Sequence, residues 1–510
     1  MKNHLPTKPF ISRRIVSGLS SRKFFIAIVV LLGIQALWIA LTGKYPMAFD
    51  EDFHLGLIRL YADHASPFWS TYPPGGNAYG ALTRDPSYLY HFLMSFPYRL
   101  IRLFTSDQTI QVLILRFINT ALFLSGLPLY QRLLRKTGAS KALVNAVLLL
   151  FVLIPIVPLL VGQINYDNLL FPLVALTLLL AIRVITSIKA GSLSMTASLQ
   201  FLTVGLIASL VKYAFLPIFV AAFIVVLVLF IRTFGVRSIR LHKIHKKTVV
   251  AAFAGRATKL SLAAFIIIFA LAFERYGINV IRYHSPVPDC NQVLTIAQCR
   301  SYGPWVRDYD LIAIKSVKSN PMSFTGQWLQ GMWLRTFFTL AGPSNDYETR
   351  GPFLVPAISS VVFVGLGIGA VAIKRRKIWK ARPTIFALLG TASLLYLLIL
   401  FLQQYKLYAN TGVPVAINGR YLIPIAPFLI LIGALGVRQF IRATVLKIGA
   451  VGLTVGCMLL GGGGLTYVLR SNDAWYWPSS PVRTANHAVQ KTIGPAIPGY
   501  THPTAFLPYP

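Results

Sequence analysis

The side chains best suited to chemistry stand together in the stretch Phe49-Asp50-Glu51-Asp52-Phe53-His54. Three adjacent carboxylates repel one another unless a cation lies among them. Asp50 and His54 are four residues apart, so in a helix they share one face. A carboxylate there can act as a general base on a hydroxyl group, or can bind a divalent metal ion. The alternative is an ordinary helix start, where acidic side chains are favoured.

A second polar stretch runs from Gly162 to Asn168, joins two apolar segments and contains the acid Asp167. Because its amide and acid groups are held between two helices, they are well placed to line a cavity. The same composition is also typical of an ordinary turn, in which Asn and Asp are common. The residues alone leave both interpretations open.

Three cations at the ends of apolar segments form a third group. Lys212 lies in a minimal break, Arg335 lies in an aromatic stretch, and Arg420 directly precedes Tyr421. Arg presents a planar fork that suits phosphate. Long basic side chains can also reach lipid headgroups without a further task. Phosphate binding is therefore a hypothesis for Arg420 and Lys212, and Arg335 stays undecided.

The composition excludes several classes of protein. Of the 510 residues, 55% are hydrophobic and 12% are charged, whereas soluble domains carry about 25% charged residues. A soluble globular domain, a disordered chain and a collagen-like fibre are therefore excluded. Three cysteines are too few for a disulfide-rich scaffold or a cysteine-rich zinc module. A polytopic membrane protein remains.

A helix that crosses a bilayer needs about 20 mainly apolar residues. The sequence offers eleven such segments, near 24–43, 111–131, 142–161, 168–188, 197–211, 214–232, 260–280, 353–373, 384–403, 421–440 and 448–468. Only Val211-Lys212-Tyr213 separates the fifth from the sixth, so one long broken helix is an alternative there. We expect an all-α polytopic membrane protein of about eleven transmembrane helices, with residues 1–470 as one transmembrane domain.

The net charge of +35 could suggest a nucleic-acid partner, but the basic residues sort to one side. In the eleven-segment topology they gather in the gaps 1–23, 132–141, 183–189, 232–259, 374–382 and 438–447. By the positive-inside rule, that side is cytoplasmic. We therefore expect a multi-pass protein of the cell membrane, with a cytoplasmic N-terminus, an outer C-terminus and no nucleic-acid partner.

The outer face then carries two long loops, 44–110 and 281–352, and a short Pro-rich tail, 471–510, without apolar periodicity after Trp477. In the first loop, residues 51–62 and the residues after Asp85-Pro86 show helical apolar stripes, which predict amphipathic helices in the membrane interface. In the second loop, Cys290 and Cys299 could form a disulfide on the oxidising side of the membrane. Two free thiols are the alternative.

An Asp-Glu pair followed by His, just after the first apolar segment, resembles the first-loop motif of GT-C glycosyltransferases such as protein O-mannosyltransferases and lipid A aminoarabinose transferases. The stretches 49–54, 165–170 and 419–424 resemble more closely a family of bacterial membrane proteins catalogued as a domain of unknown function and grouped near GT-C enzymes. The stretch 333–338 with Gly342 is similar to an aromatic-Gly segment of those proteins. The resemblance covers residues 24–470.

The resemblance implies inverting transfer of a sugar from a polyprenyl-phosphate donor to a glycan, lipid or protein acceptor at the outer face. Carried over, Asp50 would be the catalytic base, Glu51 its partner or a metal ligand, and Asp167 the second-loop acid. Arg420 and Lys212 would contact the donor phosphate. The remaining substrate-binding residues would be His54, Arg335 and Tyr421. A divalent metal ion, if one takes part, would be held by Asp50, Glu51 and Asp167.

Two other classes of function fit the same composition. A transporter or lipid flippase would need charges at mid-membrane and usually has repeated halves; the sequence shows no internal repeat and few interior charges. A polysaccharide polymerase or another assembly factor would share the outer-face cavity. Dependence on a lipid-linked sugar donor separates these classes from a glycosyltransferase.

Overall fold

The computed structural model describes residues 10–47, 50–69, 71–235, 255–315, 320–337, 340–341, 347–348, 354–380, 382–441, 443–461, 463–471, 473–478, 481–497 and 500. Helices dominate these residues. The strands among them are two residues long, β1 (Leu340–Ala341) and β2 (Tyr347–Glu348), and they pair antiparallel. The described chain is therefore an all-α protein, as the sequence predicts.

Seven helical stretches of the described residues are long and apolar enough to cross a membrane. They are α2 (Arg22–Thr42), α5 (Gln108–Arg135), α8 (Asp167–Lys189), η2 with α10 (Tyr213–Phe215, Leu216–Phe234), α13 with η3 and α14 (Arg256–Ala272, Phe273–Gly277, Ile278–Tyr283), α19 (Leu354–Lys380) and α20 (Pro383–Thr411). Shorter apolar helices are α6 (Lys141–Val152), α9 (Met195–Val211), α21 (Ala426–Phe440) and α22 (Thr444–Gly461). A multi-pass membrane protein is supported, and the count of eleven spans stays a prediction.

The remaining helices are short or lie outside the apolar segments. They are α1 (Phe10–Ser20), α3 (Glu51–Ala62), η1 (Gly76–Tyr79), α4 (Leu89–Phe104), α7 (Ile156–Val161), α15 (Cys290–Val293), α16 (Ile296–Cys299), α17 (Gly303–Ala313), α18 (Pro321–Phe337), η4 (Gly419–Leu422), α23 (Gly463–Arg470), η5 (Asp473–Trp475), α24 (Pro481–Thr492) and η6 (Gly494–Ala496).

Two predicted apolar segments are interrupted in the structure, and a third break separates two neighbouring segments. The segment 142–161 divides into α6 and α7 just before Pro155, which has no N–H to continue a helix. The segment 448–468 divides into α22 and α23 at Gly463, which has a φ of 58°. Between α9 and α10 the chain is extended at Lys212, so this region is not one long helix. Gln35 of α2 bonds at two of these breaks, since its Nε2 donates to the Val152 carbonyl at 3.4 Å and its Oε1 accepts the Gly464 N–H at 2.6 Å.

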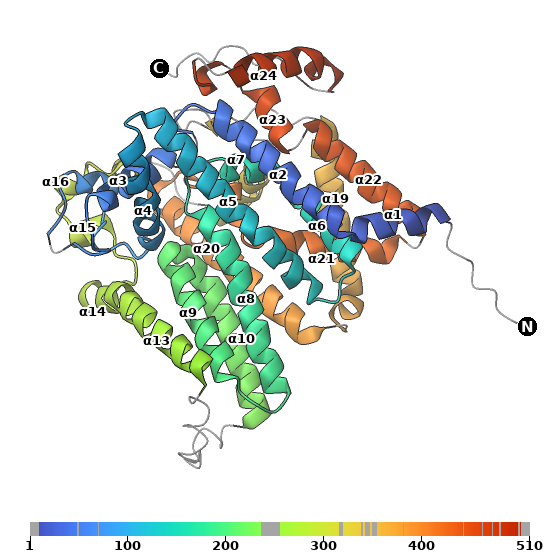
Figure 1. Ribbon diagram of the computed structural model, residues 1–510, viewed down its shortest axis with the longest axis horizontal. Helices are drawn as coiled ribbons and strands as arrows, with labels where there is room; N and C mark the ends of the chain where they lie inside the picture. The colour runs from blue at the N-terminus through green and yellow to red at the C-terminus, as the bar shows by residue number, and fades with distance from the viewer. Residues whose placement is uncertain are drawn as a thin grey trace, which may run out of the picture.

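Hydrogen bonds between helix ends mark two ends of the bundle. At one end, Lys189 Nζ bonds Thr384 Oγ1 at 2.5 Å and Thr196 bonds Thr258 at 2.6 Å. At the other end, the Tyr213 N–H donates to Ser87 Oγ at 3.0 Å. Figure 1 shows α3, α4, α15 and α16 gathered at the upper left, whereas the N-terminus lies at the right. Lys189 and Thr258 of the first group belong to two of the basic gaps, 183–189 and 232–259.

The first long loop folds into two packed helices. α3 spans Glu51–Ala62, which matches the predicted stripe. α4 begins at Leu89, three residues later than the Asp85-Pro86 signal predicts. The Asp85 carboxylate instead accepts the Ser87 N–H at 2.8 Å and closes a turn. Tertiary contacts from Ser87 to Tyr213 hold that turn and delay the helix.

Helix α4 presents a bare apolar face, as expected of an interfacial helix. Leu103 and Phe104 are each 80% exposed. Arg99, at the flank of this face, donates to the Tyr61 carbonyl at 2.7 Å, and Arg102, further round the helix, pairs with Asp63 at 2.6 Å. The charged side thus faces the protein surface, and the apolar side is left for the lipid boundary.

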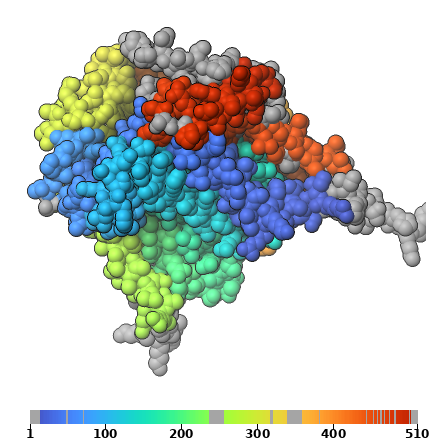
Figure 2. All heavy atoms as spheres, turned by 45° about the horizontal axis from the view of Figure 1, so that its top comes forward, coloured from blue at the N-terminus to red at the C-terminus, as the bar shows by residue number. Residues whose placement is uncertain are grey.

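The tail contains more structure than the sequence predicts. α24 forms within the Pro-rich stretch, and the Trp38 indole N–H donates to Asn486 Oδ1 at 2.7 Å. Gln490 Nε2 donates to the Val468 carbonyl at 2.7 Å. Because α24 docks through these polar contacts, the lack of apolar periodicity after Trp477 did not indicate the lack of a helix. Figure 2 shows α24 in red on the same face as the yellow segment 290–313.

The aromatic core of the helix bundle supports the site from below. The rings of Phe123 and Phe171 stack at 4.0 Å, and Tyr130 stacks on Phe171 at 4.2 Å. The Tyr130 hydroxyl donates to the Pro424 carbonyl at 2.5 Å. This stack and the Tyr130 hydrogen bond therefore connect α5 and α8 to the chain just after η4, and they hold η4 in position along the bundle.

Candidate functional site

The acidic start of α3 meets the predicted cation Arg420. Asp50 stands at the N-cap with φ 65° and ψ 34°, a left-handed conformation that Asp tolerates better than most residues. Its Oδ2 accepts from Arg420 Nη2 at 2.7 Å. The Asp50 side chain is 54% exposed, whereas that of Arg420 is 7% exposed. The acid of the pair therefore faces outward and the cation lies beneath it, and we call this pair the mouth of the site.

Arg420 is held in place by the turn that precedes it. The Asn418 side chain accepts the Arg420 N–H at 2.9 Å and starts η4. Gly419 lies directly against the backbone of Thr336 in α18, where a Cβ atom would collide with it. Arg335 donates to the Ile417 carbonyl. The sequence left the role of Arg335 undecided, and the structure places one of its bonds on this turn.

A second ion pair lies deeper, between the predicted residues Lys212 and Asp167. Lys212 Nζ is 2.7 Å from Asp167 Oδ1 and 3.0 Å from Oδ2. Both side chains are buried, with exposures of 5% and 4%. The extended backbone at Lys212 and the turn before α8 bring them together, and Asn165 Oδ1 accepts the Asp167 N–H at 2.9 Å.

Aromatic rings join the two ion pairs into one site. Lys212 Nζ lies 5.2 Å from the centroid of the Tyr421 ring, and the Arg420 guanidinium carbon lies 5.4 Å from the same centroid. Lys212 Nζ also lies 4.4 Å from the Tyr166 ring. Two cations thus share the Tyr421 ring, an arrangement favoured by the negative face of an aromatic system. The ring thus places the buried Lys212 close to the cation of the mouth.

The neighbouring carboxylate, Glu51, has a different environment. Its oxygens accept four bonds, from Arg116 Nε at 2.8 Å, Arg116 Nη2 at 2.7 Å, Met47 N at 2.8 Å and Ile164 N at 3.1 Å. Both side chains of the Glu51–Arg116 pair are 0% exposed. The carboxylate is fully satisfied, so this geometry gives it a role in holding α3 against α5 rather than one at the mouth.

His54, which the resemblance places among the substrate-binding residues, is buried in the core beneath the mouth. Its Nδ1 is 2.9 Å from His91 Nε2, and both residues are 1% exposed. Its ring also meets the Tyr166 ring edge to face at 4.5 Å. Burial lowers the pKa of His54 well below its usual range, and burial lowers the pKa of His91 to about 3. Both imidazoles are therefore neutral at pH 7, and each keeps one acceptor nitrogen.

The donor set does not fit a shared divalent ion. Asp50, Glu51 and Asp167 each face a different cation, namely Arg420, Arg116 and Lys212. Among the described residues, no three His, Cys, Asp or Glu side chains gather as a metal site requires. We assign no step to a metal.

Several contributors to the site were not predicted. Asn119 Oδ1 accepts from the Tyr90 hydroxyl at 2.7 Å and from Asn165 N and Asn168 Nδ2 at 3.3 Å. It ties the loop after α7 to α4 and α5. Arg116 carried the one available signal, a charged residue inside an apolar segment. His91 and Asn119 carried no such signal, because a single polar residue in an apolar stripe most often packs in the core.

Two predicted features fall partly outside the described residues. These are Phe49 in the acidic stretch, and Phe338 and Gly342 in the aromatic-Gly segment. In the second loop, Cys290 and Cys299 are joined by a disulfide of 2.08 Å.

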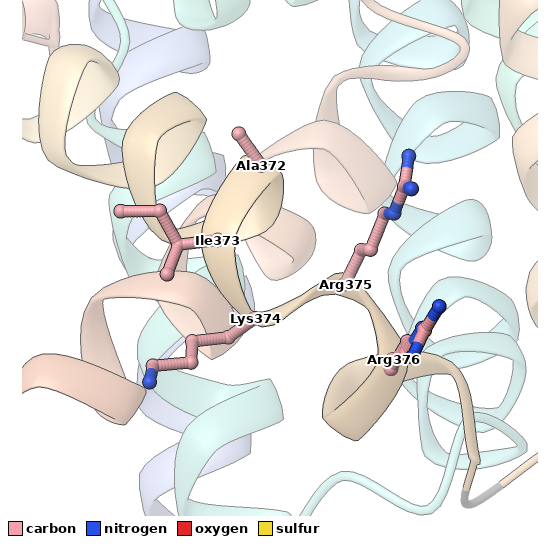
Figure 3. A pocket seen from close by; sticks show the side chains of 5 residues that line it. All are labelled: Ala372, Ile373, Lys374, Arg375 and Arg376. Atoms are coloured by element: carbon pink, nitrogen blue, oxygen red, sulfur yellow. The ribbon is translucent and has the colours of Figure 1, made fainter.

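A hollow at the other end of the bundle is lined by Ala372 to Arg376 of α19. Figure 3 shows that the Lys374 side chain points away from those of Arg375 and Arg376. The cations do not converge on a ligand, so the hollow reflects the basic character of this end.

No protein-family model, curated protein or solved structure matches the chain. The function must therefore be argued from the side chains of the site.

Proposed function

We propose that this protein is a GT-C-type glycosyltransferase that moves a sugar from a polyprenyl-phosphate donor to an acceptor at the outer face of the cell membrane. The observation that carries the proposal is the mouth of the site. An exposed carboxylate, Asp50, is paired with a buried cation, Arg420, and a second cation, Lys212, lies on the same Tyr421 ring.

The Asp50–Arg420 pair suits a donor that carries a phosphate. An arginine fork binds phosphate oxygens through parallel charge-assisted hydrogen bonds. A donor phosphate at Arg420 would compete with the Asp50 carboxylate for the guanidinium. Donor binding would then release Asp50 from its partner, so that the base becomes available only when the sugar is in place.

The chemistry needs only one base and the cations. The acceptor oxygen attacks the anomeric carbon from the face opposite the phosphate, and the bond from that carbon to the phosphate oxygen breaks. Asp50 takes the proton of the acceptor hydroxyl, and the phosphate leaves with the bonding electron pair. Arg420 and Lys212 stabilise the charge that develops on the phosphate. The configuration at the anomeric carbon inverts.

The two other acids support this set. Asp167 holds Lys212 in place through the pair at 2.7 Å. Glu51 fixes the start of α3 and thereby the position of Asp50, because its four bonds reach α5 and the loop after α7. These roles replace the metal-ligand role that the resemblance implies for Glu51.

The membrane orientation of the proposal is N-terminus cytoplasmic and C-terminus outside. It follows from the basic gaps of the sequence by the positive-inside rule. The polyprenyl chain of the donor would lie in the bilayer beside α4, whose apolar face is exposed next to the loop that carries Asp50.

The test is donor dependence in sealed proteoliposomes. Purified protein is given radiolabelled polyprenyl-phosphate sugars and an extract of outer-face glycans and lipids. We expect label in the acceptor fraction together with an equal amount of released polyprenyl phosphate. Label that crosses the bilayer still attached to its lipid would instead support a flippase. Polymer growth without consumption of the donor would support a polysaccharide polymerase.

A further inference from the structure

A collar of aromatic rings stands beside the acidic start of α3. Phe53 lies in the first turn of α3, Tyr79 ends η1, and Tyr302 follows the disulfide-linked segment. The Phe53 ring is 5.4 Å from that of Tyr79 and 6.3 Å from that of Tyr302. All three residues are partly buried. Three segments far apart in the sequence thus place their rings at one mouth.

Several structural features hold the collar in position. Gly80 has a φ of 66°, and a Cβ atom there would lie 2.7 Å from the Tyr302 ring. Gly56 lies directly under the Tyr79 hydroxyl. The Tyr302 N–H donates to the Cys299 carbonyl at 2.9 Å, which connects the ring to the Cys290–Cys299 disulfide. The close approach of two glycines and a disulfide-anchored turn indicates a built surface.

The collar continues along one face of α17. Tyr302, Trp305 and Tyr309 are spaced i, i+3 and i+7, which places them on one side of a helix. The rings of Trp305 and Tyr309 stack at 4.8 Å with 20° between their planes. The stripe from Tyr302 to Tyr309 extends about 10 Å along the helix axis. This length suits an oligosaccharide better than a single sugar ring. Figure 2 shows the yellow segment 290–313 beside the light-blue first loop.

The charges beside the stripe favour a neutral ligand. Arg307 and Asp308 pair with each other at 2.6 Å, and Arg300 lies 5.2 Å from the centre of the Tyr309 ring. Neither sign of charge gathers along the stripe. The apolar C–H face of a pyranose ring packs on aromatic rings, and its hydroxyl groups need nearby polar partners. A stripe of tyrosine and tryptophan with balanced charges supplies both.

We infer that the collar of Phe53, Tyr79 and Tyr302, extended by Trp305 and Tyr309, binds the acceptor, and that the acceptor is a neutral oligosaccharide. This inference rests on the proposed function, since it takes Asp50 as the base beside which an acceptor hydroxyl must lie. Asp50 and Phe53 are three residues apart at the start of α3, so a glycan on the collar would end near the Asp50 carboxylate.

A membrane surface is the other ligand that exposed tryptophan and tyrosine can meet. The structure assigns that task to α4, where Leu103 and Phe104 are 80% exposed. By contrast, α17 carries Arg307, Asp308 and Asp310 within its middle turns. Asp308 and Asp310 would be repelled by an anionic lipid surface, which attracts basic helices instead.

The experiment measures saturation-transfer NMR on the full-length protein in nanodiscs, with cellotetraose, maltotetraose and mannotetraose as probes. We expect transfer to the C–H protons of at least one tetrasaccharide. Trp305→Ala should weaken its binding roughly three- to tenfold, the range expected for loss of one aromatic contact. Trp305 lies on α17, which contains no buried residue, so the variant should fold. The matched control is Trp379→Ala, an exposed tryptophan at the far end of the bundle.

Three outcomes would overturn the inference. These are no transfer to any of the three tetrasaccharides, equal binding by wild type and Trp305→Ala, and strong quenching of Trp305 fluorescence by brominated lipids. The proposed function fails separately. If the glycan binds but no donor-dependent transfer occurs, the collar stands without the enzyme. If transfer occurs and the acceptor KM is unchanged in Trp305→Ala, the enzyme stands without the collar.

Discussion

Two neighbouring carboxylates, Asp50 and Glu51, begin the same helix and have opposite environments. Glu51 accepts four hydrogen bonds and pairs with Arg116, and neither side chain of that pair is exposed to solvent. Asp50 pairs with Arg420 through one bond and is 54% exposed. The two pairs use the same chemical groups, so their difference lies in what surrounds them.

The difference separates a structural ion pair from one that can react. A buried carboxylate whose acceptor positions are all used cannot take a proton without losing its partners. An exposed carboxylate with one partner can exchange that partner for a ligand at little cost, because solvent screens its charge while the partner is exchanged. Within one turn of α3, position alone therefore sets which acid can serve as a base.

The largest effect is expected from Glu51→Gln. Removing one charge of a fully buried pair leaves Arg116 uncompensated, which typically costs about 3–5 kcal/mol. We expect a large loss of thermal stability in nanodiscs, or failure to accumulate in the membrane. The matched control is Asp63→Asn, whose pair with Arg102 is exposed and should contribute at most about 1 kcal/mol. Equal stability of the two variants would contradict the distinction between the buried Glu51–Arg116 pair and an exposed ion pair.

A smaller effect is expected from Arg420→Gln on donor binding. Hydrogen bonds to charged groups contribute about 1.5–3 kcal/mol, so affinity should fall roughly 10- to 100-fold. The measurement is equilibrium binding of a prenyl-phosphonate sugar analogue to protein in nanodiscs. Arg102→Gln, an exposed arginine on α4, serves as the control. Unchanged affinity in the Arg420 variant would contradict a contact between Arg420 and the donor phosphate.

These residues also show how far sequence could lead. The bounds of α3 and the candidates Asp50, Asp167, Lys212 and Arg420 followed from motif and position, and the structure brings all four to one end of the bundle. Their pairing could not be read from the sequence. Asp50 and Arg420 are 370 residues apart, and the left-handed backbone of Asp50 turns its side chain toward Arg420.

The environment of Glu51 could not be read from the sequence for a related reason. Its environment depends on Arg116 and on the Met47 and Ile164 amides, which come together only when α2, α5 and the loop after α7 pack. Apolar periodicity located the helices of the bundle, but it did not reveal the break before Pro155 or the polar docking of α24. Patterns within a segment therefore predicted the helices, whereas contacts between segments could not be predicted from such patterns.

The buried histidines beneath the mouth predict a pH dependence of stability. The pKa of His91 falls from 6.5 when unfolded to about 3 when folded, because burial disfavours its charged form. As the pH falls, His91 therefore takes up its proton in the unfolded chain before it does so in the folded chain. The stabilisation by neutral His91 is complete above pH 6.5 and is lost as the pH falls toward 3. At pH 5 the loss from His91 alone should be about 2 kcal/mol.

Thermal unfolding in nanodiscs at pH 7.5 and pH 5 measures this loss, and the pKa of His54, lowered in the same direction by burial, adds to it. His91→Gln keeps a hydrogen-bonding side chain but cannot titrate. Its stability should change less between the two pH values than that of the wild type. A pH slope that persists undiminished in His91→Gln would place its origin elsewhere.

The most direct test is single-turnover sugar transfer from preloaded donor by Asp50→Asn. This variant keeps the shape of the side chain and removes the base, so transfer should slow by about 10²–10⁴-fold. Thermal stability should stay close to wild type, because Asp50 is 54% exposed. Asp52→Asn, the exposed neighbour, should transfer at a near-normal rate. Wild-type transfer by Asp50→Asn would contradict the assignment of the base, and loss of transfer in Asp167→Asn alone would move it to the loop after α7.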